Sequence, residues 1–97
     1  MPTYIVISDW TQQGVAEFKD TVERYESGQN SMEALGVSFK QIYWTLGEHD
    51  MVSIVDAPDD ETLAAAVLKQ ASKGNFRTAT LRALSADEMR AVIDKAG

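Results

Sequence analysis

The sequence has no cysteine, a single histidine and only two prolines among its 97 residues. Without cysteine the chain can form no disulfide, thiolate nucleophile, cysteine-ligated zinc site or iron–sulfur centre. Basic residues are also scarce, with nine lysines and arginines against 15 acids and a formal net charge of −6. This balance argues against a general nucleic-acid binder, which needs a basic face to replace counterions. It also argues against binding to an anionic membrane surface.

Long apolar runs are missing too, and no segment approaches the length that a membrane-spanning helix needs. The chain passes from Met1 directly into an apolar strand, without the basic segment and cleavage site of a secretory signal. We therefore expect a cytoplasmic protein. The length and the hydrophobic fraction of 44% fit one globular domain over residues 1–97. Its core is modest, so pairing with a second copy would bury more surface.

Apolar and β-branched runs predict four strands, at residues 4–8, 38–46, 51–55 and 76–84. A polar loop is expected over residues 9–14. Helices are expected from about residue 20 to Leu35, from Pro58 to Lys73, and after Ser85, because apolar residues recur at helical spacing there. Capping boxes are indicated by Asp20 with Glu23 and by Ser85 with Glu88.

The resulting order is strand, helix, hairpin, helix, strand, with an added C-terminal helix. At this length the order predicts an α+β domain of ferredoxin-like β-α-β-β-α-β fold, with a four-stranded antiparallel sheet. We expect two such sheets to meet in a homodimer as a dimeric α+β barrel.

Strand alternation sorts the side chains of this sheet onto two faces. Small apolar residues suit contact with helices, so Ala79, Leu81 and Ala83 are predicted to face them, together with Ile5 and Ile7. The far face is then predicted to bind a ligand through Tyr4, Ser8, Tyr43, Thr78, Thr80 and Arg82. It is also expected to carry Val6 and the hairpin residues Gln41, Thr45, Met51, Ser53 and Val55, although a slip of one residue would exchange the hairpin sets.

Two interpretations of this far face stay open. It is either a half-solvated sheet surface with satisfied hydroxyl groups, or one wall of a space enclosed between two copies. In the second case Arg82 would anchor an acid group of a small molecule.

Three segments resemble the GYD domain family. They are YWTLGEHDMV at 43–52, VDAPDDE at 55–61 and GNFRTATLRA at 74–83, and the first strand followed by TQQG at 11–14 and by Lys19-Asp20 fits the same pattern. The resemblance covers nearly the whole chain. It implies a ferredoxin-like fold related to the dimeric α+β barrels, and it implies no particular activity.

The turn motif Gly47, His49 and Asp50 departs from the family in one position, where His49 replaces a tyrosine. We favour a structural role for this turn, with a positive φ at Gly47 and turn amides bonded by Asp50. A catalytic role would draw on His49, Tyr43 and Arg82 as acid–base or oxyanion-anchoring groups. No nucleophile elbow, metal-ligand spacing or phosphate-binding glycine loop is found, so we expect neither a metal nor a cofactor.

Three functions are consistent with these features. The first is a small dimeric ligand-binding or interaction module. The second is a cofactor-free enzyme, of the monooxygenase or isomerase type found among dimeric α+β barrels, for which only analogy of fold speaks. The third is a regulatory or structural oligomer that binds a protein partner. Whether the protein is an enzyme is left open.

Overall fold

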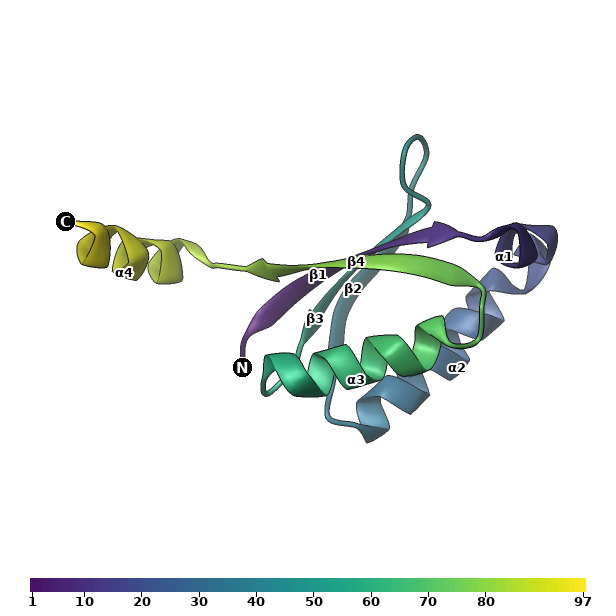
Figure 1. Ribbon diagram of the computed structural model, residues 1–97, viewed down its shortest axis with the longest axis horizontal. Helices are drawn as coiled ribbons and strands as arrows, with labels where there is room; N and C mark the ends of the chain where they lie inside the picture. Colours follow the sequence, from purple (N-terminus) through teal and green to yellow (C-terminus); the bar gives the residue numbers. More distant parts are fainter.

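The computed structural model describes all residues from Met1 to Gly97. Four strands form one sheet in the order β2-β3-β1-β4, and each neighbouring pair is antiparallel. This is the predicted ferredoxin-like α+β architecture with an added C-terminal helix. Figure 1 shows the elements, which are β1 (Thr3–Trp10), α1 (Gln12–Ala16), the 3-10 turn η1 (Phe18–Asp20), α2 (Thr21–Ala34), β2 (Ser38–Trp44), β3 (Met51–Asp56), α3 (Asp60–Ala71), β4 (Phe76–Ala83) and α4 (Ala86–Ala96).

The molecule has two layers, because the long helices α2 and α3 lie on the same side of the sheet (Figure 1). The other side has no covering element. Helix α4 continues beyond the end of β4 and extends away from the body, and none of its residues is buried. None of the helices combines the length and the apolar character that crossing a membrane requires.

Local sequence signals account for most helix boundaries. The hydroxyl of Thr11 caps α1 and the carboxylate of Asp59 caps α3, accepting from the Thr62 amide at 2.7 Å. The capping box predicted at Ser85 and Glu88 is confirmed, with both reciprocal hydrogen bonds present. Gly74 follows α3 with a φ of 84°, which a residue with a side chain rarely adopts.

The predictions for the region before α2 are wrong in two respects. Asp20 makes no side-chain capping bond, and the 3-10 turn η1 leads into α2 instead. Part of the segment predicted as a polar loop forms α1, and β1 runs on to Trp10. A Cβ on Gly14 would lie 2.1 Å from the carbonyl oxygen of Asn75, so glycine is what lets α1 approach the start of β4.

The prediction of which sheet face meets the helices is also wrong, although the alternation along β1 and β4 is as expected. Tyr4, Val6 and Ser8 lie beneath the helices, each at most 6% exposed. Ile5 and Ile7 lie on the uncovered side, where they pair with Leu81 and Ala79. The physical reason is that the helices themselves supply the small residues for close approach, such as Ala66 and Gly28, both buried.

The residues predicted to share one face of the hairpin are divided between the two faces. Met51, Ser53 and Val55 are buried beneath the helices. Tyr43 pairs with Val52 across the β2–β3 ladder, and directly opposed residues of an antiparallel pair share a face. Tyr43 and, by the same pairing with Ile54, Gln41 therefore lie on the uncovered side.

Candidate functional site

The sheet has a covered face, which meets α2 and α3, and an open face. The covered face carries five of the six predicted ligand-binding residues, and the open face carries Tyr43. The five are divided further, because Tyr4, Thr80 and Arg82 gather near one end of the strands and Ser8 pairs with Thr78 near the other. The structure therefore does not bring the six together as one binding surface.

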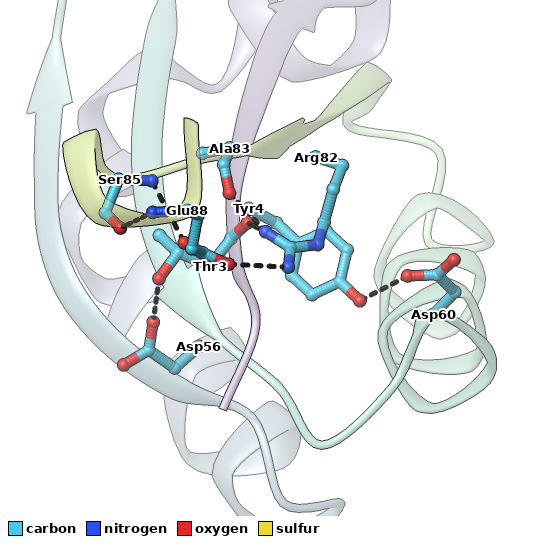
Figure 2. Close-up of polar contacts among 8 residues, drawn as sticks. All are labelled: Thr3, Tyr4, Asp56, Asp60, Arg82, Ala83, Ser85 and Glu88. Atoms are coloured by element: carbon cyan, nitrogen blue, oxygen red, sulfur yellow. Dashed lines mark hydrogen bonds and ion pairs between the residues drawn. The ribbon is translucent and has the colours of Figure 1, made fainter. Parts of the chain in front are cut away.

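Tyr4 is the centre of a polar cluster that joins the sheet to α3 and α4 (Figure 2). Its hydroxyl donates to the carboxylate of Asp60 at the start of α3, and the guanidinium of Arg82 lies 5.6 Å from the centre of its ring. The hydrogen bond to Asp60, together with burial, raises the pKa of the Tyr4 hydroxyl above its ordinary value. This tyrosine therefore stays protonated and acts as a donor.

Arg82 connects β4 to α4. Its guanidinium donates to the carbonyl oxygens of Thr3 and Ala83, and it pairs with the carboxylate of Glu88 at 3.1 Å (Figure 2). The hydrogen bond from the Ser85 amide has the larger effect and that from Arg82 the smaller, and both lower the pKa of Glu88 below its ordinary value. In this arrangement Arg82 serves the junction between strand and helix, and its role as an anchor for a ligand stays a prediction.

The turn between β2 and β3 is tied to the end of β1. Gly47 has the predicted positive φ, 102°. The carboxylate of Asp50 accepts from the Trp10 amide at 2.9 Å, so it bonds a strand amide rather than an amide of its own turn. His49 places Nδ1 3.0 Å from a carboxylate oxygen of Asp9, and both side chains are partly exposed. These contacts fix the turn against the sheet.

The three candidate catalytic residues are not assembled within one chain. His49 contacts Asp9, whereas Arg82 pairs with Tyr4, and these two strand positions are separated by roughly 16 Å along β1. Tyr43 lies on the open face, on the other side of the sheet from Arg82. A small substrate bound to one chain could not contact all three side chains, so the geometry gives the enzyme hypothesis no support.

A cavity of about 180 Å³ lies between the covered face and the two long helices. Ser8, Ser53 and Thr78 line it from the sheet, and the apolar part of its wall includes Val6, Tyr25, Met32, Phe39, Ile42, Met51, Val67 and Phe76. The helices add Arg24 from α2 and Gln70 from α3. It is the one place in the fold where buried hydroxyls, a cation and an amide surround a space.

The sequence-based prediction missed Arg24 and Gln70 as cavity residues. Gln70 continues the spacing of Leu63 and Val67, which form part of the buried side of α3. A polar residue on an apolar helical stripe is the signal that could have identified it. Arg24 gives no comparable signal, because its neighbours in α2 mix polar and apolar types.

The open face and α4 are the second candidate site. The centre of the open face is uncharged and consists of Ile5, Ile7, Tyr43, Val52, Ile54, Ala79 and Leu81, with Gln41 beside them. Charged residues occur only toward its two ends, as Asp9 with Arg77 and Asp56 with Lys40. Along α4, Met89, Val92 and Ile93 are exposed on one side. Exposed apolar side chains that lie close together are typical of surfaces that bind a partner, so the open face and α4 are both candidates for such a contact.

Comparison with known proteins identifies a matching family, a relative similar in sequence, and solved structures similar in fold. Residues 4–93 match the model of the GYD domain. A protein of Thermus thermophilus, the glutamine synthetase and cystathionine beta-lyase binding protein, is 38% identical over 85 residues. That match covers 87% of this chain and 90% of the relative.

Two solved structures resemble the fold at low identity. The crystal structure of MtbAldR has a TM-score of 0.67 at 10% identity over 87% of this chain, which spans only 52% of that protein. TTHA0845 of Thermus thermophilus has a TM-score of 0.56 at 24% identity, covering 89% of this chain and 96% of that one. At these identities the likeness shows the shared fold alone.

Proposed function

The chain belongs to the GYD domain family, and we propose that it is a non-enzymatic interaction module of the cytoplasm, a homodimer that binds a partner enzyme. The observation that carries this proposal is the open face, an apolar sheet surface that no element of the chain covers. The proposal has two parts, a second copy on the open face and an enzyme on α4.

A second copy suits the open face because the surface is uncharged at its centre and charged at its ends. A stable interface has the same anatomy, with an apolar core inside a polar rim. Because the centre of the open face carries no charge, it has no group that would favour a partner of opposite charge over a second copy. A two-fold axis that lies between the two facing sheets would bring Ile5, Ile54 and Leu81 of one copy close to the same residues of the other.

The enzyme partner is inferred from the relative, whose name states that it binds glutamine synthetase and cystathionine beta-lyase. In this chain α4 is the element best suited to such a contact. It projects from the body, and Met89, Val92 and Ile93 recur on one side at the spacing of a helix that docks in an apolar groove.

The test is binding of the purified full chain to purified glutamine synthetase and cystathionine beta-lyase from the same organism, measured by biolayer interferometry. We expect the wild type to bind at least one of them and Ile93→Asp to lose that binding. Ala91→Asp is the matched control, since Ala91 is exposed on the opposite side of α4 and the added charge is identical. Absence of wild-type binding to both enzymes would contradict the proposed partner class.

A further inference from the structure

We propose that the cavity between α2, α3 and the covered face is a binding site for a small carboxylate that carries a compact apolar body. This site lies on the other side of the sheet from the open face. It therefore goes beyond the proposed function and depends on neither the dimer nor the partner enzyme.

The size of the cavity sets the size of the ligand. Its volume is about 180 Å³, whereas an apolar cavity of about 150 Å³ in a protein core is enough to hold benzene. One ring, or a chain of a few carbons, with a carboxylate attached is therefore the scale that fits. Met32, Phe39, Ile42 and Val67 supply apolar walls for such a body.

Two residues that line the cavity each carry a buried hydrogen-bond donor that lacks an acceptor in the protein. The donors are the Nε–H of Arg24 and the side-chain Nε2 of Gln70. A buried donor without a partner costs stability, and such groups are few in native proteins. Acceptor oxygens of the proposed ligand are the partners we assign to these donors, and an ionised carboxylate forms the stronger, charge-assisted bonds.

The charge of the cavity favours an anion. Arg24 and Lys73 are among its 19 lining residues, and none of the 19 is aspartate or glutamate, although 15 of the 97 residues in the chain are acidic. The other two guanidinium nitrogens of Arg24 donate to the carbonyl oxygens of Glu17 and Gly14, at 2.7 and 3.1 Å. These bonds hold the cation in place without neutralising it.

The remaining wall suits a polar head group as well. Ser8 and Ser53 are both buried, on neighbouring strands, and their hydroxyls can donate or accept. Gly28 makes room for the amide of Gln70, because a Cβ at this position would lie 3.0 Å from Gln70 Oε1. The sheet, α2 and α3 thus each contribute a polar group to one small space.

The test is a titration of the ¹⁵N-labelled full chain with benzoate and with hexanoate, followed by NMR. Benzyl alcohol and benzylamine serve as the neutral and cationic matches of benzoate. We expect the carboxylates, at millimolar concentrations, to shift the signals of the Gln70 side-chain amide and of Arg24 Nε–H. Benzyl alcohol should bind about tenfold more weakly, as loss of a hydrogen bond to a charged group implies, and benzylamine should leave these signals in place.

Two substitutions of Gln70 test the contribution of its side-chain amide to benzoate binding. Gln70→Glu places a negative charge beside the ligand and should weaken benzoate binding at least about tenfold, whereas Gln70→Leu removes the donor without adding charge and should weaken it about tenfold. Gln12→Glu, an exposed position on α1, makes the same change in net charge and should bind as the wild type does. If neither carboxylate moves the two signals, or if benzylamine moves them as benzoate does, the proposal is overturned.

Discussion

On the covered face of the sheet Tyr4, Val6 and Val55 are at most 6% exposed, whereas on the open face Leu81 is 50% exposed. Two helices cover the first face and no element covers the second (Figure 1). Apolar side chains occur on both faces, because Tyr4 and Val6 alternate with Ile5 and Ile7 along the same strand. The difference shows that apolar character alone does not assign a residue to the core of one chain. The covered face stabilises the monomer, and the open face is available for association.

The largest effect is expected from shortening a side chain that the covered face buries. Leu63 of α3 is 2% exposed and packs in the core with Tyr4 and Val55. Leu63→Ala should lower the free energy of unfolding by about 3 kcal/mol, since it removes buried surface and leaves a cavity. Urea unfolding followed by circular dichroism measures this loss, which should be equal in dilute and concentrated protein. A loss that shrinks on dilution would place Leu63 at an interface instead.

The same shortening on the open face should behave differently. Leu81→Ala leaves the packing of α2 and α3 untouched, so at low protein concentration the change in unfolding free energy should stay within about 0.5 kcal/mol. At high concentration the wild type should gain stability by mass action and the variant should gain less. Thermal unfolding over a wide range of concentrations gives the comparison. Equal concentration dependence in both proteins would count against the open face as the interface.

The smallest effect concerns the cap that starts α3, the helix that covers Tyr4. The Thr62 backbone amide donates to the carboxylate of Asp59 and lowers its pKa below the ordinary value. A carboxyl with a depressed folded pKa stabilises the protein above its unfolded pKa of about 3.9, and this stabilisation is lost as the pH falls through the folded pKa.

Asp59→Asn should therefore lose less stability than the wild type between about pH 5 and pH 2, because asparagine caps the helix but does not titrate there. Urea unfolding at a series of pH values measures the difference. Asp94→Asn, on the exposed α4, is the control and should follow the wild-type profile. If the free energy of unfolding fell in parallel for Asp59→Asn and the wild type as the pH decreased, Asp59 would not contribute to the acid dependence of stability.

The element order and the C-terminal cap could be predicted because their signals are local. Ser85 and Glu88 are three residues apart and satisfy one another, and Gly47 and Gly74 adopt the positive φ that ends a strand or a helix. The orientation of the sheet could not be predicted in this way. Both Ile5 with Ile7 and Tyr4 with Val6 are suitable for burial, and the choice depends on small residues in α2 and α3 that pack against the covered face.

The cavity depends even more on tertiary structure. Arg24, Ser53 and Gln70 are far apart in the sequence and belong to three elements, so no spacing rule connects them. The predicted trio of His49, Tyr43 and Arg82 shows the converse. Each residue has suitable chemistry, but the strand register keeps them apart.

The proposed homodimer needs a second copy to cover the open face, and the mass of the protein in solution shows whether it does. Sedimentation equilibrium at micromolar concentration should give the wild type twice the chain mass of 10.7 kDa. Leu81→Asp should give the mass of one chain. Leu68→Asp, which adds the same charge at a 70% exposed position on α3, should remain dimeric. A wild type that sediments as a single chain would show that the open face does not bind a second copy.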